Sequence, residues 1–226
     1  MGRIDLLRVL DQKWDDGRRP KDLFAAHVAK HPAAYVADLV AGLESKSARV
    51  RNGCAEICSL LAAAQPRILY PHVDRFLERL DAKDKAVRWE AVCTVGSLAT
   101  VDAAGATRAS VGPITRHLAQ ESIVLQGHAV RALAKLARSF PDLAPGILRQ
   151  LIAAKGRFPG TRVGYLVEAM AAFADDLALA AEAARFLDGH IESDLAPVRT
   201  KARRARKALL PPTPDADWWR SRRQSL

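Results

Sequence analysis

Residues 47–61, SARVRNGCAEICSLL, and residues 84–98, DKAVRWEAVCTVGSL, repeat one pattern at an interval of 37 residues. In both stretches apolar or small residues recur every three or four positions, which predicts an amphipathic helix with one buried face. The matched residues are Val50, Arg51, Cys54, Cys58 and Leu61 in the first stretch, and Val87, Arg88, Ala91, Val95 and Leu98 in the second. Neither helix can bury its apolar face alone, so we expect the two copies to pack against each other.

The pattern continues on both sides of these stretches. A shorter apolar segment precedes each copy, and further copies follow at intervals of 38, 37 and 35 residues. Two helices per repeat, each stacked on its neighbours, predict an all-α, right-handed α-solenoid of about six antiparallel hairpins. We expect a repeat array over residues 1–210 and a tail rich in Pro, Trp and Arg over residues 211–226. The hairpins are expected at residues 4–31, 33–64, 66–101, 105–139, 142–174 and 176–210.

Helix-breaking and helix-capping residues fall at the positions that this array requires. Proline follows the apolar segments at equivalent places and is expected to end one helix and begin the next. Ser or Asp stands three residues before the first apolar residue of each long helix, where an N-cap is expected. The prolines are Pro32, Pro66 and Pro141, and the expected N-caps are Ser47, Asp84 and Ser122.

The two quoted stretches resemble the second helix of HEAT repeats, with a Val-Arg entry followed by small and aliphatic residues. The resemblance spans roughly residues 20–210 and is strongest over residues 33–101. It implies a curved array in which the second helices line the concave wall. Arg51, Arg88 and Arg199 share one repeat position, so we predict that they form a sparse ladder near that wall.

Composition narrows the class of protein further. The chain has 226 residues, 49% hydrophobic and only 6% aromatic, which excludes disordered and collagen-like chains. Asp5 and Arg8 interrupt the first apolar run, so no signal-peptide core is present, and no stretch is long enough to span a bilayer. An odd number of cysteines does not suit a disulfide framework. Together these features predict a cytoplasmic protein.

We find no pattern that requires a metal or a cofactor. The repeat places Cys54 and Cys58 at core positions, where a thiol acts as a small apolar group. His128 aligns with Glu90 at a position expected to be exposed. The stretch KGRFPGTR, residues 155–162, fits an anion-binding loop or a simple interhelix turn, and the turn is the favoured interpretation.

Charge is the strongest functional clue in the sequence. The chain carries a net charge of +10, and residues 195–226 hold nine Lys or Arg against two Asp. In the last helix, Arg199, Arg203 and Arg206 flank one side of the apolar stripe. They predict a binding surface, either for the phosphates of a nucleic acid or for an acidic protein. The alternative is that they form the polar outer face that a terminal repeat needs. Trp218 and Trp219 in the tail are expected to fold back over the end of the array.

The leading functional hypothesis is a non-enzymatic scaffold that binds a protein or peptide, with an acidic partner compatible with the charge. No membrane partner is expected. The first alternative is a nonspecific nucleic-acid-binding protein that uses the basic C-terminal helix. The second alternative is a DNA glycosylase for alkylated bases, because some of these enzymes have a HEAT-like fold. Its candidate carboxylates would be Glu90 beside Trp89, or Glu168 beside Tyr165.

Overall fold

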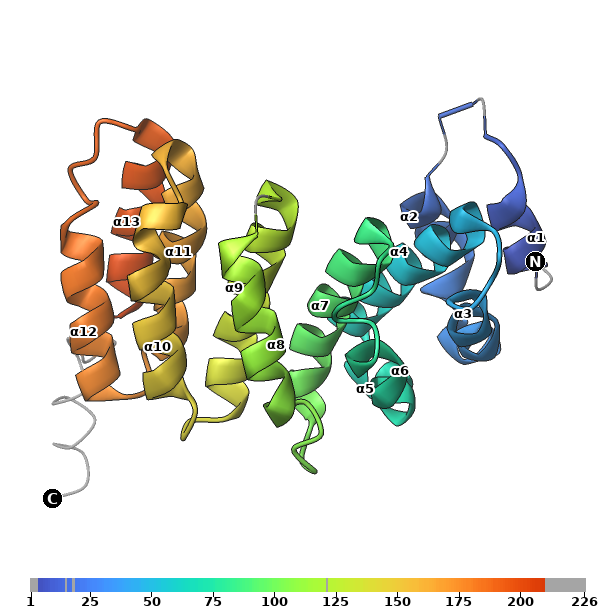
Figure 1. The fold of residues 1–226 in the computed structure, drawn as a ribbon, viewed down its shortest axis with the longest axis horizontal. Coiled ribbons are helices and arrows are strands. Elements are labelled where there is room, and N and C mark those ends of the chain that lie inside the picture. The colour runs from blue at the N-terminus through green and yellow to red at the C-terminus, as the bar shows by residue number, and fades with distance from the viewer. Residues whose placement is uncertain (1–3, 15, 18, 121, 210–226) are drawn as a thin grey trace, which may run out of the picture. The chain divides into compact units, whose positions relative to one another are not determined.

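All regular secondary structure in the described residues is helical. The structure is a computed structural model that describes residues 4–14, 16–17, 19–120 and 122–209. Within each compact part of the chain, successive helices run in antiparallel pairs (Figure 1). The prediction of an all-α solenoid is therefore confirmed. No helix in these ranges combines the length and the apolar character needed to cross a membrane.

The chain divides into two compact units, unit 1 from Met1 to Gln150 and unit 2 from Leu151 to Leu226. The division falls within one helix, α10 (Ala144–Ala153). The expected separation into an array over residues 1–210 and a tail over residues 211–226 stays a prediction, because residues 210–226 lie outside the described part.

In unit 1, short first helices alternate with long second helices. The 3₁₀ and π-helical turns that join them carry the label η. In chain order the elements before α10 are α1 (Leu6–Asp11), α2 (Pro20–Leu23), η1 (Phe24–Val28), η2 (Pro32–Ala34), α3 (Val36–Gly42), α4 (Ala48–Ala64), α5 (Pro66–Leu69), η3 (Tyr70–His72), α6 (Val73–Leu77), α7 (Lys85–Leu98), η4 (Ala99–Val101), η5 (Arg108–Ser110), α8 (Val111–Arg116), η6 (His117–Ala119) and α9 (Ile123–Ser139).

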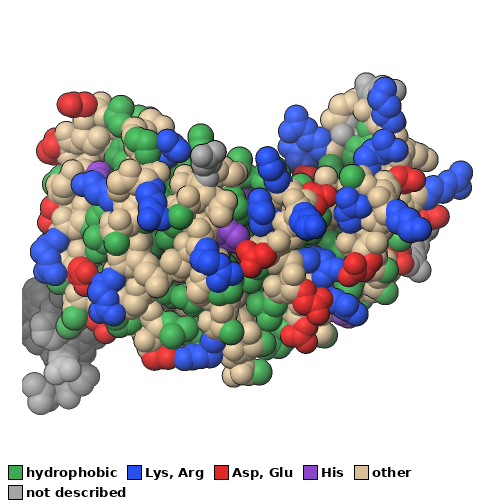
Figure 2. Space-filling view, in the orientation of Figure 1, with side chains coloured by type: hydrophobic (Ala, Val, Ile, Leu, Met, Phe, Trp, Pro, Cys, Tyr) green, Lys and Arg blue, Asp and Glu red, His purple; other side chains and the backbone are tan. Residues whose placement is uncertain are grey.

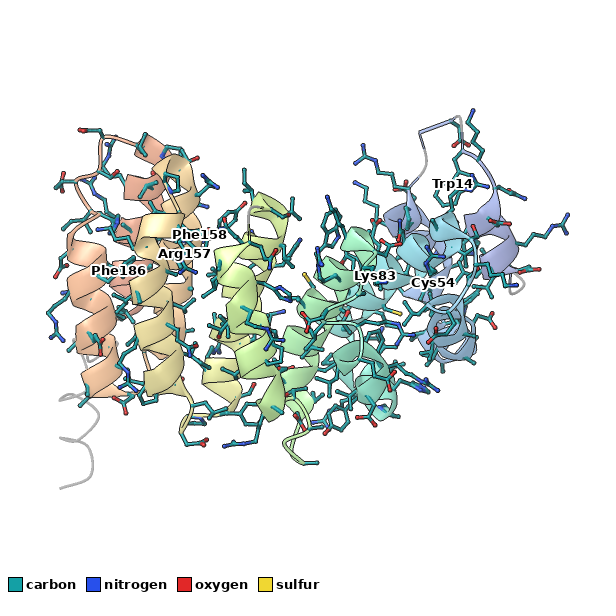
Figure 3. The ribbon with its side chains drawn as sticks, in the orientation of Figure 1. Trp14, Cys54, Lys83, Arg157, Phe158 and Phe186 are labelled. Atoms are coloured by element: carbon teal, nitrogen blue, oxygen red, sulfur yellow. The ribbon has the colours of Figure 1, made fainter. Side chains whose placement is uncertain are left out.

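The second helices of unit 1 form its packed centre, with α7 between α4 and α9. The short helices α3, α6 and α8 each pack on the second helix that follows them. At Gly96 the backbones of α7 and α9 approach closely, because a Cβ atom there would lie 2.7 Å from the Cα of Ala132. The predicted apolar stripes are buried, among them Cys54 and Cys58 at 0% exposure. Cys54 is shown within α4 in Figure 3.

The capping residues expected from the sequence stand at the starts of α4, α7 and α9. Asp84 accepts hydrogen bonds from the backbone N–H groups of Ala86 and Val87 at 3.1 and 3.4 Å. Ser122 accepts from the N–H of Leu125 at 3.4 Å. Ser47 occupies the N-cap position of α4 without a side-chain cap bond, and its hydroxyl instead bonds to Asp11. Asp84 and Ser122 therefore fix where α7 and α9 begin.

The turn between α7 and α8 is organised by one buried carboxylate, that of Asp102. Its two oxygens accept from the backbone N–H groups of Ala106 and Thr107 at 3.0 and 2.6 Å and from the hydroxyl of Thr107 at 2.7 Å. The hydroxyl of Tyr70 donates to the same carboxylate from the preceding repeat. This network ties the turn to its neighbour and gives a buried charge the donors that it needs.

Unit 2 contains the same kind of helix pairs over residues 151–209. After the end of α10 its elements are η7 (Ala154–Arg157), η8 (Gly160–Arg162), α11 (Val163–Ala169), η9 (Met170–Phe173), α12 (Leu177–Asp188) and α13 (Ala196–Ala208). Helix α13 packs on α11 and α12 and buries Val198, Ala202 and Ala205, which are three residues of its predicted apolar stripe. The basic residues of α13 stand outside this stripe.

Candidate functional site

Arg51, the first residue of the predicted ladder, holds a turn of its own hairpin. Its guanidinium donates to the backbone carbonyls of Ser45 and Lys46 at 2.7 and 2.9 Å. It also reaches Asp84, the N-cap of α7, with Nη2 3.3 Å from Oδ2. Arg51 therefore links the N-terminal end of α4 to the N-terminal end of α7, and its guanidinium has hydrogen-bond partners within the chain.

Arg199 makes the corresponding turn contact in unit 2. Its guanidinium donates to the carbonyl of Ser193, six residues earlier, as Arg51 does to Ser45. At two of the three equivalent positions, Arg51 and Arg199, the arginine thus stabilises the turn between the two helices of its hairpin. A ladder across Arg51, Arg88 and Arg199 stays a prediction, since Arg199 belongs to the other unit.

Arg88 is different, because it lines a cavity and has a buried donor atom without a partner in the described ranges. The cavity has a volume of about 420 Å³ and lies where α7 and α9 begin. The Nε atom of Arg88 is buried and has no hydrogen-bond partner among the described residues. The lining residues are Lys85, Arg88, Trp89, Ala119, Gln120, Ser122 and Leu125. The cavity thus combines two cations with an indole ring, and these seven side chains include no acid.

A chain of polar contacts crosses the second helices beside this cavity. Glu90 on α7 accepts from the hydroxyl of Ser59 on α4 and from the indole N–H of Trp89 at 3.2 Å. Burial raises the pKa of Glu90, while the bonds from Ser59 and Trp89 oppose that shift. Further along, Lys135 on α9 donates to the hydroxyl of Ser97 at 2.8 Å.

Cys93 on α7 and His128 on α9 are also in contact, with Sγ 2.8 Å from Nδ1. His128 is half-buried, so the expectation that it is exposed was wrong: the neighbouring helix α7 covers it. Burial lowers the pKa of His128, and burial together with Glu90 raises the pKa of Cys93 to about 12. At neutral pH the thiol is protonated, so the pair lacks the thiolate that nucleophilic chemistry requires.

Five of the six cations of α13 have partners within unit 2. Arg203 donates to both carboxylate oxygens of Glu192 at 3.0 and 3.1 Å and to the carbonyl of Ile191 at 3.1 Å. Arg206 donates to Asp188 at 3.0 Å. Lys201 and Arg204 both pair with Glu168 on α11. On the face of the molecule in Figure 2, acidic side chains likewise lie among the basic ones.

The other residues considered from the sequence give no second site. In the stretch over residues 155–162, Phe158 is 2% exposed, so this segment anchors its turn in the core of unit 2 (Figure 3). Glu168, a candidate glycosylase carboxylate, is engaged by two cations, and Glu90 by two donors. Trp218 and Trp219 lie outside the described residues. Within the described ranges, no three His, Cys, Asp or Glu side chains gather as a metal site.

The sequence identified Arg88 as a site residue, but it indicated Ser122 only as an N-cap and Trp89 only as the neighbour of Glu90. Lys85, Gln120 and Ser122 line the same cavity, and Trp89 forms part of its wall as well as bonding to Glu90. A signal for this site was present at the N-cap positions, since Asp84 is charged and Ser122, one repeat later, is not.

Comparison with known proteins supports the fold. No protein-family model matches the chain, and no curated protein matches it. Among solved structures, a designed armadillo repeat protein is similar with a TM-score of 0.64 and 21% identity, over 90% of this chain and 92% of that one. A second designed armadillo repeat protein, in complex with the peptide (KR)4, is similar with a TM-score of 0.65 and 20% identity, over 90% of this chain and 91% of that one. An engineered protein from structural genomics has a TM-score of 0.64 and 18% identity, over 92% and 99% of the two chains.

The fold thus defines an armadillo-like α-solenoid repeat protein. Membership of the HEAT family in particular stays a prediction.

Proposed function

We propose that this chain is a non-enzymatic repeat scaffold that binds an extended peptide segment of a partner protein along the second helices of unit 1. The observation that carries this proposal is the cavity between the starts of α7 and α9, where Trp89 meets Lys85 and Arg88. Trp and Arg in a partly desolvated recess are the residue types that dominate binding energy at protein interfaces.

The dimensions of the cavity favour a side chain as its occupant. A volume of about 420 Å³ is at the small end of ligand pockets, which run from about 300 to 1,000 Å³. The space suits one side chain of a longer ligand, while the backbone of that ligand crosses the adjoining helices. A rigid array of helices provides such a surface without a large ordering cost on the scaffold side.

The comparison with designed repeat proteins supports this class of function. One of the similar structures is a complex with the peptide (KR)4, so a protein of this fold can bind a peptide. That peptide is basic, whereas the cavity described here is lined by two cations. We therefore expect a different, non-basic sequence preference for this chain.

Nucleic-acid binding through α13 ranks second in this proposal. Arg199, Arg203 and Arg206 each have a partner in unit 2, and a phosphate would have to displace it. The net charge of +10 still supports weak, salt-dependent association with any polyanion.

The test is selection of peptides from a random library displayed on phage, with the full chain as target, followed by calorimetry on the soluble peptides. Trp89→Ala should weaken binding at least tenfold. Ala119→Phe should also weaken binding at least tenfold, because Ala119 is an exposed residue of the cavity wall and a larger side chain there would occupy the cavity. Leu177→Ala is the matched control, because Leu177 is an apolar side chain in unit 2 that is 85% exposed.

Circular dichroism verifies that each variant is folded. Failure to select any peptide, or selected peptides that bind both cavity variants as tightly as the wild type, would exclude this function.

A further inference from the structure

Arg51 occupies the same repeat position as Arg88, one repeat earlier in unit 1. At Arg51 a carboxylate of the chain itself, that of Asp84, is bound. Arg51 and Arg88 both stand four residues after an N-cap, Ser47 and Asp84 respectively. Around Arg51 there is a cavity of about 470 Å³ whose lining includes Asp84. Lys83, which also lines it, is labelled in Figure 3 beside the start of α7.

In that earlier copy, Asp84 brings its carboxylate to Arg51 from the start of the next helix. The Nη2 atom of Arg51 lies 3.3 Å from Oδ2 of Asp84. The amide of Asn52, with its nitrogen turned toward Asp84, donates to both carboxylate oxygens at 3.1 Å. The chain itself thus shows which group this repeat position accommodates: a carboxylate held by the arginine and the residue after it.

In the later copy this carboxylate is absent from the N-cap. The N-cap of α9 is Ser122, and Arg88 and Trp89 take the positions of Arg51 and Asn52. The Nε atom of Arg88 is buried without a partner among the described residues, and Lys85 adds a second cation to the same cavity. A buried donor without an acceptor is unfavourable, so the described part of the chain does not fully satisfy the guanidinium of Arg88. Two cations in one recess repel each other, and an anion bound there would relieve that repulsion.

We propose that the cavity at Arg88 binds the carboxylate of an acidic side chain on the bound peptide, in the place that Asp84 takes for Arg51. This inference rests on the proposed function, because a peptide supplies the side chain. Arg88 provides a planar fork of donors that matches a carboxylate, and Lys85 adds charge. The ring of Trp89 gives the methylene groups of a Glu side chain an apolar wall. The cavity therefore selects Glu or Asp at one position of the peptide.

The first experiment supplies the carboxylate from the chain itself and needs no ligand. Ser122→Asp keeps a strong N-cap and places a carboxylate where Asp84 stands in the earlier copy. We expect it to raise the melting temperature by about 2 to 4 °C. Ser122→Asn is the matched control, since it has the same shape and caps equally well but carries no charge. In a double-mutant cycle, Arg88→Gln should remove the gain from Ser122→Asp and leave Ser122→Asn unchanged.

The second experiment uses the selected peptides. Replacing the acidic residue of a peptide by its amide should weaken binding about tenfold to the wild type and leave binding to Arg88→Gln unchanged. Ser122→Asp should weaken binding of the acidic peptide by a similar factor, because Arg88 is then paired with a carboxylate of its own chain, whereas Ser122→Asn should not.

Glu121 lies outside the described residues and is the carboxylate closest in sequence to Ser122, so it needs its own control. If Glu121→Gln lowers the melting temperature in the wild type but not in Arg88→Gln, the chain already supplies the carboxylate and the inference is wrong. It is also wrong if Ser122→Asp and Arg88→Gln show no coupling.

The two experiments separate this inference from the proposed function. Peptides that depend on Trp89 but not on their acidic residue would leave the scaffold function standing and overturn the carboxylate site. Coupling between Ser122→Asp and Arg88→Gln without any selectable peptide would support the chemistry of the cavity and count against the peptide-binding function.

Discussion

Helices α7 and α13 are both second helices that carry an arginine near their start, yet their charges have different uses. Helix α13 has six cations and no acid in its own sequence, but acids and carbonyls from neighbouring segments pair with most of them. Helix α7 has only two cations, and one of them, Arg88, keeps a buried Nε atom without a partner in the described residues. The comparison shows that the number of charges on a helix does not predict how many are available to a ligand.

The two helices also differ in how closely they are packed. Gly96 on α7 meets the backbone of α9, whereas Gly164 on α11 meets the flexible side chain of Lys201 on α13. Backbone cannot move aside as a lysine side chain can. We therefore expect the centre of unit 1 to tolerate change less well than the interface around α13.

The largest expected effect follows from this difference. Gly96→Ala places a Cβ atom 2.7 Å from the Cα of Ala132 and should cost roughly 1 to 3 kcal/mol, a fall of about 3 to 10 °C in melting temperature. Gly164→Ala meets Lys201 Cδ at 3.2 Å and should be neutral or slightly stabilising, because alanine favours the helix. Thermal unfolding followed by circular dichroism measures both. Equal falls in melting temperature for the two variants would contradict the expected difference in packing between the centre of unit 1 and the interface around α13.

The next prediction compares the two arginines at one repeat position. Arg51→Gln removes bonds to two turn carbonyls and to Asp84, so we expect a loss of about 1 to 2 kcal/mol. Arg88→Gln removes no hydrogen bond seen within the described residues and should change stability by less than about 0.5 kcal/mol. Urea unfolding of the two variants gives the difference. If Arg88→Gln is the more damaging change, Arg88 has an intrachain partner and is not available to a ligand.

The third prediction concerns pH and the polar contacts of α7 and α9. Burial lowers the pKa of His128, so its contribution to stability is present above its unfolded pKa and is lost as pH falls through its folded pKa. Burial raises the pKa of Glu90, so its contribution is present at low pH and is lost as pH rises through its folded pKa. His128 is close to Cys93 on α7 and to Arg131 on α9.

Relative to the wild type, His128→Gln should therefore become more stable as pH falls from about 7 to 5, and Glu90→Gln as pH rises from about 4 to 7. Melting temperatures of the three proteins across this range provide the measurement. Parallel curves for all three would show that neither group is buried in solution.

The smallest expected effect concerns α13 and nucleic acid. If Arg199, Arg203 and Arg206 contact phosphates, replacing all three with Gln would make the salt dependence of binding shallower by about 0.9 for each lost contact. We expect a much smaller change, because these arginines are engaged within unit 2. The control variant replaces the exposed residues Arg67, Arg138 and Arg185 with Gln, so that it has the same net charge as the α13 variant.

Fluorescence anisotropy with a labelled duplex at two salt concentrations compares these proteins. Binding tighter than about micromolar at physiological salt, lost only in the α13 variant, would make nucleic-acid binding the leading function.

The fold was predictable because its determinants are local. Apolar spacing of three and four residues defined the second helices, and Ser47, Asp84 and Ser122 stand at their N-caps as expected. The site was only partly predictable, because the partners of its residues come from other repeats or from across the turn of the same hairpin. Cys93 and His128 are 35 residues apart, and Arg203 and Glu192 are separated by a turn. Charge counted along one helix misses the acids that neighbouring helices contribute, and alignment with Glu90 could not reveal that α7 covers His128.

Asp84 both caps a helix and pairs with the arginine of the preceding repeat, and this double role has a consequence for how such arrays diversify. Ser and Asp are nearly equivalent as N-caps, so exchanging them at this position leaves the helix intact. The same exchange decides whether the preceding arginine is occupied by its own chain or open to a ligand. After a repeat is duplicated, one codon can therefore turn a structural contact into a recognition position while the fold is conserved. An engineer could use the N-cap in the same way, opening or closing individual positions along an array without redesigning its core.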